Sequence, residues 1–491
     1  MATMRRKTFQ ARPLLPALVI GLASAAHAQT TEIKPALNVL FEATTNGIGT
    51  LGAAPRKDLI ITTSPEVDVI VRGVRSNLTA HLRLDNKQYV RNSQTDHTLP
   101  SGDVKLHSTL LDQWGGLDAS VVTSQVKASI LSQPSGSSDG YTTTQVKLSP
   151  YLEHQFDART LLQARITRSV TTSSEVVNDP ASQALAPRPN RHLTERSLRL
   201  ERRPSPLGAT LEWNDQETRD AGQAHALWTQ SVVKSAAMVA LTDEVHAGVL
   251  VGRESIEVPL QAKHSDTVRG MRLSLHPNER ATLDADVERR FFGTAWKLDV
   301  QHRMPFLAWQ LQSKIEPSTS TPPIGETPCA PDDLEIQCAL KKQQRPTSSV
   351  YTLSAKLLQS TFLRFVMMGQ RNTLTLSGGL NKTNPLPLPG IAVGSGASDN
   401  LTTERYAEAL LNRRLTPQTS VSTGVRWSLN SETPTTGDVV RTRNVSVKGA
   451  INSKLSPTTT ATMGVRHQVT RSSQLNTSDE SAMFVGLGYR Y

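Results

Sequence analysis

Hydrophobic and polar residues alternate along several segments of the chain, as expected for β-strands with one apolar and one polar face. Segments 296–304, 307–315, 460–468 and 483–491 all show this alternation, and 420–429 shows it most regularly. In 420–429, one set consists of Val421, Thr423, Val425, Trp427 and Leu429, and the other of Ser420, Ser422, Gly424, Arg426 and Ser428. A helical period of 3.6 would mix these two sets. The pattern predicts about 22 strands from Ala36 to Tyr491, and any even number from about 16 to 24 is compatible with it.

The connections between the alternating segments fall into two kinds. Short turns containing proline are predicted at 203–206, 275–278, 304–305, 415–418 and 455–458. Proline fixes φ near −65° and cannot donate to a strand ladder, so it marks a hairpin bend. Longer polar segments are predicted as loops at 45–57, 92–102, 173–191, 255–266, 316–348, 382–401 and 430–440, and 350–369 is interpreted as one strand. This sorting favours an all-β fold, a transmembrane antiparallel up-and-down β-barrel, over a soluble β-sandwich.

The first 28 residues are typical of a secretory signal peptide. Arg5, Arg6 and Lys7 precede an apolar stretch, and Ala26-His27-Ala28 is a small-x-small cleavage site. We therefore predict a cleaved signal at 1–28, export through the secretory pathway, and a barrel domain at 29–491. The formal charge of the chain is +11, and the predicted signal accounts for four of these charges. The remaining charge is spread along the chain, and it gives no indication of nucleic-acid binding.

The last segment has a pattern that resembles the assembly signal of bacterial outer-membrane barrels. Met483, Val485, Leu487, Tyr489 and Tyr491 share one face, and Gly486, Gly488 and Arg490 lie on the other. The resemblance implies that Gly486, Tyr489 and Tyr491 contact the barrel-assembly machinery and that the protein resides in the outer membrane, surrounded by its lipid. Phe484 departs from the pattern, because a polar residue is usual at that position.

The chain has two cysteines, Cys329 and Cys338, in a segment rich in Pro, Ser and Thr. In an oxidising compartment this spacing predicts one local disulfide. A zinc site is the alternative, but no histidine lies nearby and two thiolates do not complete such a site.

Two motifs have the letters of enzyme signatures but lack the structural context that the chemistry needs. Gly47-Ile48-Gly49-Thr50-Leu51-Gly52 has the letters of a dinucleotide fingerprint, but Pro55 follows where a helix must begin. Gly136-Ser137-Ser138-Asp139-Gly140 has the letters of a nucleophile elbow without the strand–turn–helix context. Asp284, Asp286 and Glu288 repeat with the period of a strand, which favours a solvated lumen wall over acid–base catalysis. We predict no catalytic residues, no cofactor and no metal.

Basic residues recur on the polar faces of the last strands. They are Arg426, Lys448, Lys454, Arg466 and Arg490. A polar interior is usual in these barrels. A more specific hypothesis is a basic track along the lumen that favours an anionic solute or polymer, since rings of like charge tune the selectivity of a pore.

Several short stretches resemble the outer-membrane proteins associated with the PEP-CTERM/exosortase system of proteobacteria. They are Pro35-Ala36-Leu37-Asn38-Val39, Glu42-Ala43-Thr44-Thr45-Asn46, Ser64-Pro65-Glu66-Val67, and the segment 369–377. The resemblance implies a role beside exopolysaccharide assembly or export. Our first hypothesis is a passive conduit or scaffold, in which the basic residues of the last strands line the route of an anionic polysaccharide. The alternatives are a general diffusion porin for small solutes and a surface structural or adhesive barrel.

Overall fold

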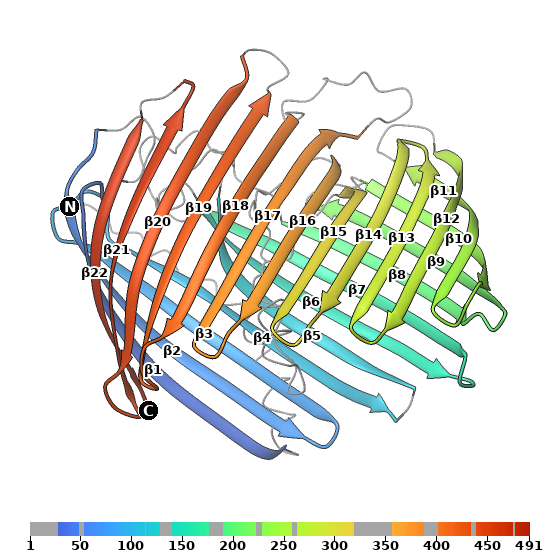
Figure 1. The fold of residues 1–491 in the computed structure, drawn as a ribbon, viewed down its shortest axis with the longest axis horizontal. Coiled ribbons are helices and arrows are strands. Elements are labelled where there is room, and N and C mark those ends of the chain that lie inside the picture. Colours follow the sequence, from blue (N-terminus) through green and yellow to red (C-terminus); the bar gives the residue numbers. More distant parts are fainter. Residues whose placement is uncertain are drawn as a thin grey trace, which may run out of the picture.

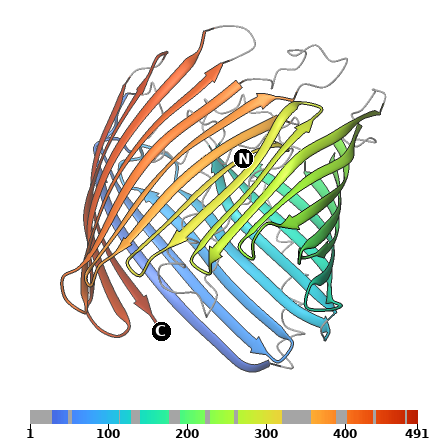
Figure 2. The same ribbon diagram turned by 45° about the vertical axis from the view of Figure 1, so that its right-hand side comes forward.

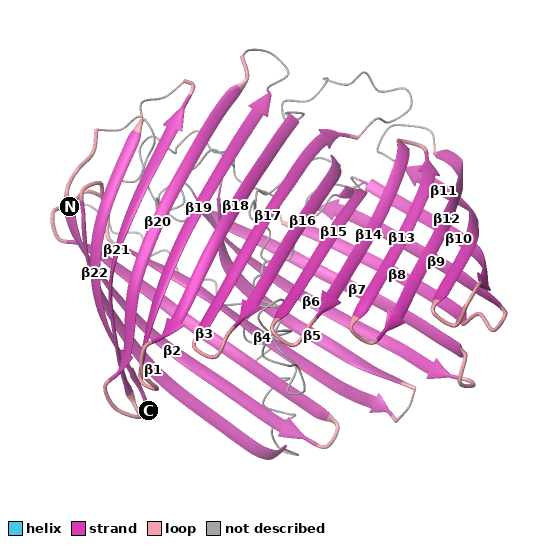
Figure 3. Ribbon diagram, in the orientation of Figure 1, coloured by secondary structure: helices cyan, strands magenta, loops and turns pink. Residues whose placement is uncertain are grey.

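The computed structural model describes residues 28–48, 54–112, 114–127, 140–175, 190–221, 228–257, 263–318, 356–386, 401–433, 438–474 and 477–491. These residues form a 22-stranded sheet, and Figure 3 shows strands joined by turns and loops throughout the described part. No helix in the described part of the chain has the length and hydrophobicity needed to cross a membrane. The all-β class and the predicted strand number are confirmed.

The strands follow one another along the chain, with boundaries close to those of the alternating segments. They are β1 (Ala28–Thr44), β2 (Asp58–Gly73), β3 (Ser76–Tyr89), β4 (His97–Leu111), β5 (Gly115–Lys127), β6 (Gly140–Gln155), β7 (Thr160–Glu175), β8 (Arg191–Arg202), β9 (Leu207–Asp220), β10 (Trp228–Ala240), β11 (Val245–Glu257), β12 (His264–Asn278), β13 (Ala281–Arg290), β14 (Gly293–Arg303), β15 (Leu307–Ser318), β16 (Lys356–Met368), β17 (Asn372–Pro385), β18 (Leu401–Arg414), β19 (Thr419–Thr433), β20 (Val440–Lys454), β21 (Thr459–Ser472) and β22 (Ser478–Arg490).

Each strand pairs antiparallel with the next, and the last strand returns to the first. Ala36 of β1 lies opposite Arg490 of β22, and Thr44 lies opposite Ala482. This pairing closes the sheet and leaves no free edge, which is required where no water can satisfy an open strand. Figures 1 and 2 show the tilted strands of the front and back walls running around a common interior.

The alternation of side chains gives the barrel an apolar outside and a polar inside. On β1, Leu37 and Phe41 face outward and are exposed, and Glu42 faces inward. On β22, Val485 and Leu487 are exposed on the outside. An exposed apolar face on every side of a closed barrel is the surface that lipid covers.

The connections sort largely as predicted, with short turns at one end of the barrel and mostly longer connections at the other, where the two-residue connection 291–292 is an exception. Turns at 203–206, 304–306, 415–418 and 455–458 match the predicted ones, and the segments 45–57, 176–190 and 386–400 join strands at the opposite end. In barrels of this kind the short turns are periplasmic and the long loops extracellular. His302, a polar residue on the apolar face of its strand, lies next to the 304–306 turn, with its ring 6.2 Å from that of Trp309.

Several predicted boundaries are wrong. The first strand begins at Ala28 rather than at Ala36, and β17 and β19 extend to Pro385 and Thr433, into segments predicted as loops. Residues 97–102, predicted as loop, belong to β4, where Pro100 lies opposite Leu84. The bend predicted at 275–278 lies two residues later, because β12 continues through Pro277 to Asn278 with an irregularity in its pairing to β13. Local turn chemistry indicates where a strand weakens, and the register of the neighbouring strand decides where it ends.

Two outward-facing tryptophans bond to serines on the next strand. Trp213 Nε1 donates to Ser231 Oγ at 3.2 Å, and Trp296 Nε1 donates to Ser313 Oγ at 2.9 Å. The indole N–H thereby has an acceptor on the outer surface of the barrel, where lipid offers few.

Candidate functional site

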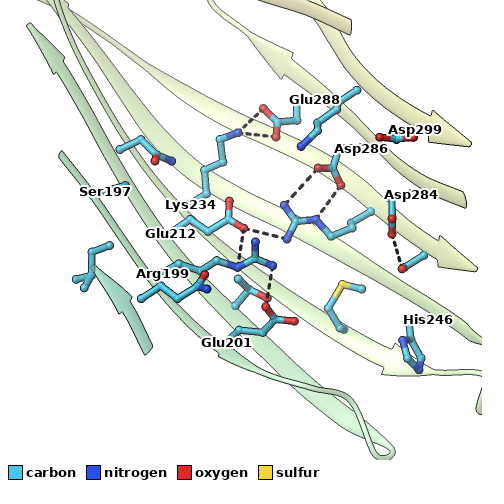
Figure 4. Close-up of a pocket in the computed structure, with 18 of the residues that line it drawn as sticks. Ser197, Arg199, Glu201, Glu212, Lys234, His246, Asp284, Asp286, Glu288 and Asp299 are labelled. Atoms are coloured by element: carbon cyan, nitrogen blue, oxygen red, sulfur yellow. Dashed lines mark hydrogen bonds and ion pairs between the residues drawn. The ribbon is translucent and has the colours of Figure 1, made fainter. Parts of the chain in front are cut away.

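The candidate site is a cavity of about 1160 Å³ in the lumen, lined by side chains from β6 to β15. Period-2 alternation turns the polar set of each strand toward the lumen. The lining side chains are therefore mainly charged or polar, in spite of the apolar outer surface of the same strands. Figure 4 shows the cavity from within, with acidic and basic groups directed toward one another.

A chain of ion pairs runs along the wall of this cavity. Arg272 Nε lies 2.8 Å from Asp286 Oδ1, and Arg272 Nη1 lies 3.2 Å from Glu212 Oε1. Arg199 extends the chain, because its Nε lies 4.0 Å from Glu212 Oε1 and its Nη2 lies 2.7 Å from Glu201 Oε2. The side chains come from β8, β9, β12 and β13, and these contacts connect four strands that are not all neighbours in the sheet (Figure 4).

A second ion pair spans two intervening strands. Lys234 Nζ of β10 lies 2.6 Å from Glu288 Oε1 of β13 and 2.8 Å from Oε2 (Figure 4). The strands between them carry Gly252 and Gly270 on the inner face. A Cβ at Gly252 would lie 3.2 Å from Lys234 Cγ, and one at Gly270 would lie 3.2 Å from Glu288 Cγ. The glycines leave the space through which the two charged side chains meet.

The three acidic residues found by their period all face this cavity. Asp286 pairs with Arg272 and Glu288 with Lys234, and Asp284 accepts a hydrogen bond from Ser274 Oγ at 2.6 Å. Sequence reasoning found the acids and missed their basic partners. Lys234 and Arg272 occupy positions of their strands whose side chains face the lumen, and this alternation could have identified them from the sequence.

The residues of the predicted basic track lie on the inner face of β19 to β22, and three of them contact acids. Arg466 Nη2 lies 2.7 Å from Glu42 and 2.7 Å from Glu480. Arg490 Nη2 lies 3.4 Å from Asp68 Oδ2, and Arg426 Nη1 lies 4.0 Å from Glu408 Oε2.

The two lysines of the track differ from its arginines. Lys448 Nζ lies 5.3 Å from the centre of the Phe484 ring, an arrangement favourable for a cation. Lys454 has no ion pair within the described ranges. The positive charge of the track is therefore balanced at Arg466 and carried mainly by these lysines.

The residues of the predicted assembly signal occupy both faces of β22. Gly486 lies opposite Leu40 of β1, Tyr489 is exposed on the outside, and the backbone N–H of Tyr491 donates to Pro35 at 2.9 Å. Their contact with the assembly machinery stays a prediction.

Other predicted features lie outside the described residues. The signal segment is described only at its last residue, Ala28, and the segment 319–355 with Cys329 and Cys338 is not described. Of the two glycine-rich motifs, only Gly47, Ile48 and Gly140 are within the described ranges. Among the described residues, no group of three or more His, Cys, Asp or Glu side chains is placed to hold a metal ion.

No protein-family model matches the sequence, and no curated protein matches it. Solved structures do resemble the fold. The FrpB iron transporter from Neisseria meningitidis (F3-3 variant) is 10% identical, with a TM-score of 0.50 over 93% of this chain and 81% of that chain. The siderophore receptor PirA from Acinetobacter baumannii is 10% identical, with a TM-score of 0.47 over 94% of this chain and 81% of that chain.

The likeness to FrpB concerns the fold alone. Together with the closed sheet, the apolar outer wall and the polar lumen, it defines a class: a transmembrane β-barrel of the outer-membrane type.

Proposed function

We propose that this chain is a passive outer-membrane conduit or scaffold for extracellular polysaccharide. The observation that carries the proposal is the cavity in the lumen, whose lining alternates carboxylate acceptors with guanidinium and ammonium donors. A sugar chain presents hydroxyl groups that both donate and accept hydrogen bonds. A wall of closely spaced donors and acceptors offers such a chain successive partners as it moves.

The resemblance to the PEP-CTERM-associated proteins supports the same direction. The charge balance refines the substrate class: with Arg466 held between Glu42 and Glu480, the lumen has no continuous row of uncompensated bases within the described residues. We propose a neutral or weakly acidic polysaccharide as the chain that passes or assembles here.

A general diffusion porin is the second candidate, because the cavity volume alone suits small solutes as well. Two assays on a clean deletion strain separate the candidates: polysaccharide at the cell surface and uptake of small solutes. We expect loss of surface polymer, restored by the wild-type gene, with solute uptake unchanged. Unchanged polymer with reduced uptake identifies a porin.

Reconstitution tests the conduit directly. Proteoliposomes are assayed with linear oligosaccharides of increasing length, and we expect permeation to fall slowly with length. The matched variant is Arg272→Met with Glu212→Gln and Asp286→Asn, which removes the ion pairs of Arg272 and leaves Arg199 paired with Glu201. A cut-off at small sugars, identical in both proteins, contradicts the conduit.

A further inference from the structure

Arginines stand on the outer wall of the barrel where its apolar band ends toward the long loops. On β11, exposed Val249 and Val251 are followed by outward-facing Arg253. On β12, Arg269 lies beside exposed Met271 on the same outer face, nearer the long-loop end. On β13, Arg289 lies beside exposed Val287 in the same way. All three arginines are exposed. We call them the β11–β13 arginine patch.

The register places two of these charges face to face. Arg269 lies directly opposite Arg289, and Arg253 lies opposite Thr267, diagonal to Arg269. Like charges in directly opposite positions of a sheet repel. None of the three side chains has an ion pair or hydrogen bond within the described ranges.

A second group repeats the arrangement on another part of the wall. Arg405 of β18 lies opposite Leu429, Leu429 lies opposite Arg443 of β20, and Arg443 lies opposite Arg471 of β21. We call Arg405, Arg443 and Arg471 the β18–β21 arginine row. All three are exposed.

Among the described residues of the strands around this row, one outward-facing acid lies nearby. Asp479 of β22 is diagonal to Arg471 and lies 3.7 Å from His467. None of the three arginines of the row has an ion pair among the residues that the structure describes. The row therefore carries excess positive charge and, like the patch, lies toward the long-loop ends of its strands.

We propose that both groups bind the phosphates of a glycolipid of the lipid A class in the outer leaflet. The long-loop end of the barrel faces the cell exterior, so this boundary lies where the headgroups of the outer leaflet begin. Guanidinium groups bind phosphate oxygens through paired, charge-assisted hydrogen bonds. A phosphate between Arg269 and Arg289 would pair with both guanidinium groups and offset their mutual repulsion. This explains why two like charges are placed opposite each other.

Native mass spectrometry of the detergent-solubilised protein tests this proposal. The probes are lipid A with both phosphates, fully dephosphorylated lipid A and phosphatidylglycerol. We expect wild-type protein to retain lipid A most strongly. Arg269→Gln with Arg289→Gln, and separately Arg443→Gln with Arg471→Gln, should each weaken retention about tenfold at the affected site.

The matched control is Arg413→Gln, an exposed outward-facing arginine at the turn end of β18, which should retain lipid A like wild type. The pair Arg269→Lys with Arg289→Lys keeps the charges and should recover most binding. The shift between heated and unheated protein on a detergent gel checks that each variant has folded.

Three outcomes overturn the proposal. The first is equal retention of lipid A by wild type and both double variants. The second is equal retention of dephosphorylated lipid A, which indicates binding by acyl chains alone. The third is equal, arginine-dependent retention of phosphatidylglycerol, which indicates a general anionic surface.

Discussion

The ring of Phe484 on β22 lies over Gly464 of β21, on the lumen side of the barrel. The two residues are directly opposite each other in the register, and a Cβ at Gly464 would overlap both this ring and the carbonyl oxygen of Gly449. Phe484, which departs from the usual polar residue at its position, is thus matched to a neighbour without a side chain.

Substituting Gly464 by Ala should therefore destabilise the barrel by about 1–3 kcal/mol, because the added methyl group overpacks this contact. Adding Phe484→Ala should recover part of the loss, and the overlap with Gly449 should keep the rest. A urea titration, in which the gel shift reports the folded fraction, measures both effects. Gly449→Ala is the control, since a Cβ at Gly449 meets nothing within 4 Å; an equal loss there would contradict the packing explanation.

Ser313→Ala should cost about 1 kcal/mol, because it leaves the Trp296 indole N–H without its acceptor on the outer wall. The double substitution Trp296→Phe with Ser313→Ala removes donor and acceptor together. A double-mutant cycle in lipid vesicles should show coupling between the two residues. Strictly additive losses would mean that the bond contributes nothing to stability.

Lys234→Met should destabilise the folded barrel by about 3 kcal/mol, because Glu288, only 8% exposed at its side chain, loses its counter-charge. Combining it with Glu288→Gln should restore most of the stability, since no charge then remains unpaired. Arg75→Met is a control at an exposed ion pair with Asp112, where we expect less than about 1 kcal/mol. Similar losses at both positions would refute this assignment.

Lys448→Glu with Lys454→Glu should shift the ion selectivity of the reconstituted protein severalfold toward cations, because these lysines carry most of the uncompensated charge of the track. The reversal potential under a KCl gradient measures the shift. Arg413→Glu, on the outer wall, should leave the potential unchanged. The prediction rests on an open lumen, and a protein without conductance would contradict the proposed conduit as well.

Much of the architecture could be predicted from local pattern. Alternation in segments such as 420–429 identifies the strands and assigns Arg426 to the inside, because side-chain direction in a strand depends only on position parity. The prolines at 417 and 457 mark turns because their fixed φ acts within a few residues. The prediction is wrong at 97–102, where pairing with β3 and β5 holds Pro100 and Gly102 in a strand in spite of their turn preference.

The sequence by itself therefore determined the strand number, the two faces of each strand and the sorting of turns from loops, all of which depend on spacings of a few residues. Only the tertiary structure decided which charges meet. Glu42 reaches Arg466 because β1 closes on β22, and Lys234 reaches Glu288 over Gly252 and Gly270 because the wall curves there. Such pairs depend on closure and curvature of the whole sheet, which parity along one strand does not encode.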